Sequence, residues 1–119
     1  MKLYGLRIFV DDYDAAKEFY IETLGLPLTW EMEELGAFGA GLDNAEFIVE
    51  EASDAESDGY VGRFVGVSLQ AGNIMARYEE LTGRGVNFTQ APKQQVWGGV
   101  LAHFKDPAGN VLTLLGEAN

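Results

Sequence analysis

The stretch WGGVLAHFKDPAGNVLTLLG, residues 97–116, predicts a strand that enters a tight turn and leaves as a second strand. GVLAHFK (99–105) and NVLTLLG (110–116) are both mostly apolar runs of strand length. The DPAGN sequence between them suits a turn, because its proline presets φ and its glycine and asparagine tolerate positive φ. We therefore expect the chain to end in two strands of a sheet.

The same order of predicted elements occurs in both halves of the chain. In the second half, FVGVSLQ (64–70) alternates as a half-buried strand, Asn73 can cap a helix over 74–85, and VNFTQ (86–90) is a further strand. The first half shows a strand at 3–10, a helix capped by Asp12 or Asp14 and ended by Gly25, and strands at 26–32, 36–42 and 45–51. Two βαβββ copies offset by roughly sixty residues indicate an internal duplication.

These patterns predict an α+β fold in which two tandem βαβββ modules form curved mixed sheets. Each module has one helix, so one face of each sheet lies beneath that helix and the other is left to form a concave cup. We expect a single domain over 1–119, with module 1 at about 1–52, a linker at 53–62 and module 2 at about 63–119. The alternative is that the second face is the polar outer face of an open sheet. Strand alternation places on that face Arg7, Phe9, Ser68, Gln70, Val111, Thr113 and Leu115.

Composition and charge narrow the function classes. The hydrophobic content of 47% can build a core, and the absence of cysteine excludes disulfides, thiolate metal sites and cysteine nucleophiles. Residues 1–62 hold three basic and fifteen acidic residues, a net charge of -12, whereas the rest of the chain carries +1, for a total of -11. Such a surface disfavours nucleic-acid and membrane partners and would attract a cationic ligand, unless the acids serve solubility alone. The start, MKLYGLRIFVDD, is typical of neither a signal peptide nor a membrane span, so we expect a cytoplasmic protein.

Two stretches resemble a known family. VDDYDAAKEFYIETLG (10–25) and WGGVLAHFKDPAGN (97–110) are similar to sequences of the vicinal oxygen chelate superfamily, which includes glyoxalase I, extradiol dioxygenases, fosfomycin-modifying enzymes and bleomycin resistance proteins. The resemblance covers nearly the whole chain. It implies the paired βαβββ fold and, in the metal-dependent members, a divalent ion held by His, Gln and Glu side chains on the cup-facing strands.

The positions that correspond to those metal ligands carry poor donors here. They fall at Gly5, Ile48, Gly66 and Thr113. Glycine and isoleucine offer no donor atom and a lone threonine hydroxyl is a weak one, although Glu46 and Glu50 flank the second position. We therefore expect no metal and no other cofactor, and assign no catalytic residue.

Without the metal, the resemblance points to the bleomycin-resistance-like branch. The leading prediction is a metal-independent small-molecule binding protein, with a cationic drug as one candidate ligand, that forms a homodimer. The alternative is an enzyme, a glyoxalase-like lyase or isomerase or a dioxygenase-type enzyme, with a non-standard site built from Arg7, Glu50 and His103. A third hypothesis is an interaction module whose concave sheet docks another protein.

The sequence allows two interpretations for several of the candidate side chains. His103 is either a general acid or base or a hydrogen-bonded strand histidine, and the aromatic side chains are either ligand walls or core and dimer contacts. An arginine in a cup needs an anionic partner, which Glu50 or a ligand carboxylate could supply. The candidate ligand-binding residues are Arg7, Phe9, Trp30, Phe38, Glu50, Ser68, Gln70, Trp97, His103 and Thr113.

Overall fold

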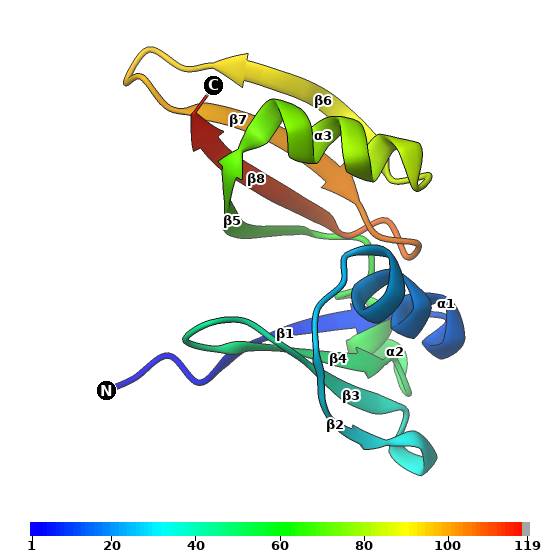
Figure 1. Cartoon of the computed structure of the whole chain (residues 1–119). Coiled ribbons are helices and arrows are strands. Elements are labelled where there is room, and N and C mark those ends of the chain that lie inside the picture. The colour runs from blue at the N-terminus through cyan, green and yellow to red at the C-terminus, as the bar shows by residue number, and fades with distance from the viewer. Residues whose placement is uncertain (118–119) are drawn as a thin grey trace. The chain divides into compact units, whose positions relative to one another are not determined.

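The computed structural model describes residues 1–117, and within them the chain forms the two predicted tandem modules of an α+β fold (Figure 1). By their contacts, Met1–Arg63 and Pro107–Asn110 form one compact unit, and Phe64–Asp106 forms a second with the chain from Val111 on. Each unit holds a four-stranded mixed sheet. Among residues 1–117, no helix is long and apolar enough to cross a membrane.

The sheet of the first unit has the strand order β1-β4-β3-β2. Its outer strand β1 pairs in parallel with β4, whereas the β2–β3 and β3–β4 pairs are antiparallel. The helical crossover between β1 and β2 lies on one face, as the parallel pairing of β1 requires. The elements are β1 (Gly5–Val10), α1 (Tyr13–Lys17), the π-helix η1 (Glu18–Thr23), β2 (Leu28–Met32), the 3-10 helix η2 (Glu33–Leu35), β3 (Ala37–Gly41) and β4 (Glu46–Glu51).

The second unit repeats this topology with the order β5-β8-β7-β6. Its outer strand β5 pairs in parallel with β8, and the other two pairs are antiparallel. The segment that connects the two sheets contains one short helix, α2 (Ala55–Asp58). The remaining elements are β5 (Phe64–Asn73), α3 (Ile74–Gly83), β6 (Asn87–Gln94), β7 (Val100–Lys105) and β8 (Val111–Glu117).

The predicted helix starts are confirmed, and the course of the first helix differs from the prediction. Asp12 is the cap of α1, because its carboxylate accepts the Ala15 N–H at 3.1 Å. Asn73 caps α3 in the same way, with a 3.1 Å bond from the Ala76 N–H. The first helix does not continue as a regular α-helix to Gly25 but widens into a π-helix over Glu18–Thr23. That stretch contains no glycine or proline, so the sequence offers no signal for the change.

In the first unit, the apolar core lies between the sheet and the α1–η1 helix. Ile8, Phe47 and Val49 are fully buried, and the Tyr20 ring from η1 packs on Phe47 with a centroid distance of 5.7 Å. Phe38, one of the predicted ligand-binding residues, does not lie on the open face. Its ring is fully buried against Tyr13 because β3 alternates Phe38 and Ala40 inward with Ala37, Gly39 and Gly41 outward.

In the second unit, α3 covers one face of the sheet (Figure 1). Its buried Ile74 and Leu81 lie on the side that faces the strands. On the sheet, Phe104 is fully buried and its ring lies 5.4 Å from that of Phe88, which in turn contacts Tyr78 of α3 at 4.7 Å. In both units, therefore, one sheet face is occupied by the helix and the opposite face is left for other contacts.

Candidate functional site

The open face of the first sheet is organised in rows across the strands. Phe9, Glu50 and Ala37 are register partners on β1, β4 and β3, and Arg7 and Ile48 are partners in the row beside them. Since directly paired residues share a face, these side chains project together away from the α1–η1 helix. On β3 the first of these rows carries only the small side chain of Ala37, and space remains above the sheet there.

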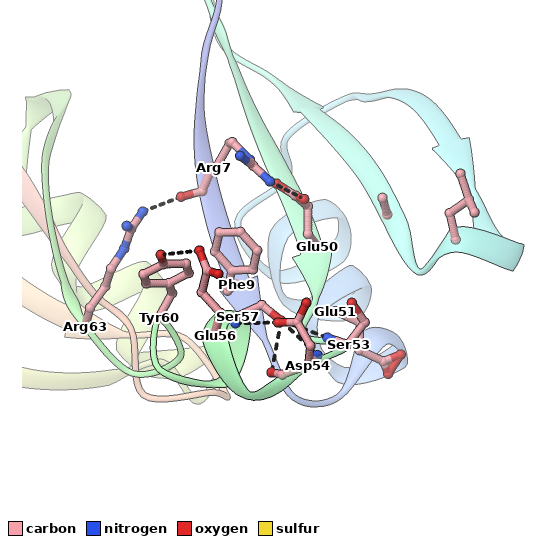
Figure 2. A pocket seen from close by; sticks show the side chains of 12 residues that line it. Arg7, Phe9, Glu50, Glu51, Ser53, Asp54, Glu56, Ser57, Tyr60 and Arg63 are labelled. Carbon is pink, nitrogen blue, oxygen red and sulfur yellow. Dashed lines mark hydrogen bonds and ion pairs between the residues drawn. The ribbon is translucent and has the colours of Figure 1, made fainter.

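That space is a cavity of about 670 Å³, which we call the acidic pocket. Figure 2 shows its two walls, one from β1 and β4 and the other from the segment that follows β4. It contains four carboxylates, two guanidinium groups and two aromatic rings. The lining residues are Arg7, Phe9, Leu35, Ala37, Glu50, Glu51, Ser53, Asp54, Glu56, Ser57, Tyr60 and Arg63.

Arg7 and Glu50 form a bidentate ion pair that lines the acidic pocket. The Arg7 Nε donates to Glu50 Oε2 at 2.6 Å and Nη2 donates to Oε1 at 2.9 Å. Hydrogen bonding and charge from Glu50 raise the pKa of Arg7. The Arg7 side chain is still 62% exposed, so the pair contributes no more than about 1 kcal/mol to stability. Glu50 is one of the two partners that the sequence left open for Arg7.

The second wall of the acidic pocket is the connecting segment around α2. Asp54 caps α2 by accepting the Ser57 N–H at 2.7 Å, and this bond lowers the pKa of Asp54. The Tyr60 ring lies 5.2 Å from that of Phe9, and the Tyr60 hydroxyl donates to Glu56 at 3.2 Å. This wall thus contributes an aromatic ring and two carboxylates, those of Asp54 and Glu56, to the pocket.

A second cavity of about 440 Å³ adjoins the ion pair on the same sheet face, and we call it the Trp30 pocket. The Trp30 indole N–H donates to Glu46 at 3.0 Å, and the Thr29 hydroxyl donates to the other oxygen of Glu46 at 2.7 Å. The bond from Thr29 is the main cause that lowers the pKa of Glu46. Gly39 makes room for the indole, because a Cβ there would overlap it. The lining residues are Tyr4, Arg7, Trp30, Met32, Ala37, Ile48 and Glu50.

The candidate residues of the second unit form a row on their own sheet. Ser68, Thr113 and His103 are successive register partners on β5, β8 and β7. His103 Nδ1 lies 2.9 Å from the hydroxyl of the buried Thr113. The Phe64 ring packs on the His103 ring with a centroid distance of 6.0 Å. This contact fits the hydrogen-bonded strand histidine, one of the two interpretations that the sequence allowed.

The other two candidates of this unit lie apart from that row. Gln70 pairs with Leu115 farther along β5. Trp97 lies in the turn between β6 and β7, is 63% exposed, and rests against Gly99, where a Cβ would overlap its ring. Neither residue lines the acidic pocket or the Trp30 pocket.

The sequence-based list missed several residues of the acidic pocket. Glu56 and Tyr60 belong to the predicted linker (53–62) and Arg63 follows it directly, yet all three line the acidic pocket. Tyr4 and Met32 in the Trp30 pocket were missed as well. The only sequence signal for the first group was a tyrosine within an otherwise polar run, which does not say where the ring lies.

The residues at the superfamily's metal-ligand positions do not fit a divalent ion. Gly5, Ile48 and Gly66 carry no donor atom, and the Thr113 hydroxyl is already bonded to His103. Across residues 1–117, no three His, Asp or Glu side chains gather closely enough to share a metal. We therefore derive no chemical step through a metal at these positions.

Comparisons with known proteins agree with this fold. The family model described as "Glyoxalase/Bleomycin resistance protein/Dioxygenase superfamily" matches residues 3–114. The uncharacterized protein YraH of Bacillus subtilis is 28% identical, over 96% of this chain and 97% of its own. A crystal structure of a superfamily member from Sphaerobacter thermophilus matches with a TM-score of 0.82 and 28% identity, over 98% of both chains. That of TnmS3, described as an antibiotic binding protein from Streptomyces sp. CB03234, has a TM-score of 0.82 and 26% identity, over 99% of this chain and 97% of its own.

Proposed function

Because the chain belongs to the Glyoxalase/Bleomycin resistance protein/Dioxygenase superfamily, we propose that it binds a small cationic molecule in the acidic pocket and releases it chemically unchanged. The observation that carries this proposal is the pairing of carboxylates with aromatic rings around one open cavity. Superfamily membership and an antibiotic-binding structural neighbour support small-molecule binding.

The charged groups that line the acidic pocket favour a cationic ligand. Both guanidinium groups of the acidic pocket already have partners, since Arg7 is paired with Glu50 and Arg63 donates to the Arg7 carbonyl oxygen. The carboxylates of Glu51 and Glu56 line the same cavity. A cation there is attracted by these carboxylates. A cation that displaces the Arg7 guanidinium, which lies 5.1 Å from the centroid of the Phe9 ring, also gains a cation–π contact of about 0.5–2 kcal/mol.

The Arg7–Glu50 pair also suits a binding site because it can open at low cost. An exposed pair worth at most about 1 kcal/mol can exchange Arg7 for a ligand cation at Glu50 without unfolding the sheet. The enzyme alternative built on Glu50 and His103 has less support, because Glu50 is engaged by Arg7 and His103 by Thr113.

We further propose that the protein forms a homodimer. Several large apolar side chains on and beside the open face of the first sheet are strongly exposed, including Tyr4 and Leu35 at 75% and 70%. A second copy of the chain would cover such side chains and enclose a pocket that one chain leaves open. Light scattering coupled to gel filtration, giving the mass of two chains, would support this.

The binding proposal is tested by titration calorimetry with bleomycin and ethidium as cationic probes and anilinonaphthalene sulfonate as an anionic one. We expect heat from at least one cationic probe, weakening as salt rises, and recovery of the probe at unchanged mass. Glu51→Gln and Glu56→Gln should each lower affinity about fivefold, the equivalent of about 1 kcal/mol for a charge at contact distance. The exposed Glu79→Gln on α3 makes the same change in net charge and should leave affinity unaltered.

Two outcomes would overturn this proposal. Binding of the anionic probe alone would show that the pocket carboxylates do not select the ligand. Conversion of a bound probe to a product of different mass would favour the enzyme alternative, and loss of that activity in Glu50→Gln would assign it to this face.

A further inference from the structure

The DPAGN turn contains a buried side chain that the proposed function does not use. Asn110 is fully buried, and its carboxamide makes three hydrogen bonds within the first unit. Its Nδ2 donates to the carbonyl oxygen of Phe9 at 2.8 Å. Its Oδ1 accepts the N–H groups of Gly62 at 2.9 Å and Arg63 at 3.1 Å.

These three bonds join the two walls of the acidic pocket. Phe9 is on β1, whose side chains form the strand wall, whereas Gly62 and Arg63 end the connecting segment that forms the other wall. Asn110 itself is not among the residues that line the cavity. It therefore connects the two walls without lining the cavity, so it would not contact a bound ligand.

The chemistry of this bridge requires an amide. One end must donate and the other must accept twice, which an asparagine side chain does and an aspartate or a leucine does not. The turn also packs closely on the segment it holds. A Cβ on Gly62, whose φ is +79°, would lie 3.4 Å from the carbonyl oxygen of Ala108, and a Cβ on Gly109 would lie 3.8 Å from the Gly62 Cα.

We propose that Asn110 is a positioning residue for the acidic pocket, which sets the distance between Phe9 on β1 and Tyr60 on the connecting segment. Tyr60 lies two residues before Gly62, so the anchor at Gly62 and Arg63 limits how far the ring can move from Phe9. Loss of the anchor would let the second wall swing away while the sheet itself stays paired. The effect on ligand affinity rests on the proposed function, but the wall position does not.

The test uses the full chain with Asn110→Ala, and Leu81→Ala as a matched control that destabilises the protein from α3 without touching the pocket. Amide hydrogen exchange by NMR should accelerate about tenfold or more at Gly62 and Arg63 relative to β3–β4 amides, because each loses its acceptor. The nuclear Overhauser contact between the Phe9 and Tyr60 rings should weaken. Leu81→Ala should leave that contact and the relative exchange rates as in the wild type.

Asn110→Asp provides a second variant should Asn110→Ala fail to fold. An aspartate keeps acceptors for Gly62 and Arg63 but cannot donate to the Phe9 carbonyl, so these amides should stay protected while the Phe9–Tyr60 contact weakens. In either folded variant, ethidium affinity should fall about tenfold, the equivalent of one hydrogen bond of ordinary net strength. An unchanged ring contact in both variants would overturn the proposal. If wild-type protein binds no cationic probe, the proposed function fails, yet the ring contact and exchange rates still decide the role of Asn110.

Discussion

The substitution Gly39→Ala tests how the Trp30 pocket is built. A Cβ at position 39 would overlap the Trp30 indole and lie close to the Thr29 side chain. The backbone φ of Gly39 is not positive, so the effect comes from space rather than from backbone strain. The indole must move, and its hydrogen bond to Glu46 must lengthen or break.

The magnitude follows from opposing contributions to the free energy of unfolding. Overpacking costs about 1–3 kcal/mol, and a half-exposed hydrogen bond to a carboxylate adds about 1 kcal/mol. Alanine in place of glycine restricts the unfolded chain and offsets about 0.4–1 kcal/mol. We expect a net loss of about 2 kcal/mol, which lowers the urea midpoint by about 1 M for a chain of this size.

The assay is urea unfolding followed by tryptophan fluorescence in a Trp97→Phe background, which leaves Trp30 as the single reporter. Native Gly39→Ala protein should also show altered Trp30 emission. Gly83→Ala at the end of α3 is the matched control, because a Cβ there meets no atom within 4 Å, and it should leave the emission unchanged. A Gly39→Ala protein with wild-type midpoint and emission would refute the close packing of Trp30 on Gly39.

Further predictions concern the ion pair, pH, the core and metal. Glu50→Gln should change unfolding free energy by less than about 1 kcal/mol while weakening cationic probes, since Arg7 is exposed and loses its partner. The Glu46 pKa is lowered, so its stabilisation of Trp30 is present above its ordinary value of 4.5 and is lost as pH falls through the lower folded value. Trp30 emission should therefore change only below that pH, and Glu46→Gln should abolish the change. Leu81→Ala should cost about 2–5 kcal/mol in urea unfolding. Zinc or nickel should leave the melting temperature in calorimetry unaltered.

The fold was predictable because its signals are local and repeated. Alternating apolar residues in β1, the caps Asp12 and Asn73, and the DPAGN turn each act within a few residues, and the duplication let one half check the other. The errors came where local rules compete. Phe38 is a predicted ligand-binding residue because an aromatic ring suits a ligand wall, but the alternation of β3 turns it into the core.

The candidate site was predictable only where a strand pattern determines direction. Alternation predicts Arg7 and Phe9 on one face, and the resemblance adds Glu50 beside the metal-ligand position Ile48; all three line one cavity in the structure. Tyr60 and Glu56 escaped prediction because nothing in a polar connecting segment says which sheet it folds against. Their positions depend on contacts between residues far apart in the chain.

The sequence by itself determined the paired βαβββ elements, the poor donors at the superfamily's metal-ligand positions, and the concentration of acid in the first half. Only the tertiary structure decided what those acids do, because hydrogen bonding and ion pairing depend on distances that no sequence interval encodes. Glu46 holds Trp30 and Glu50 holds Arg7, while Glu51 and Glu56 line an open cavity. The buried amide of Asn110 joins Phe9 to Gly62 for the same physical reason: folding brings together groups that lie far apart along the chain.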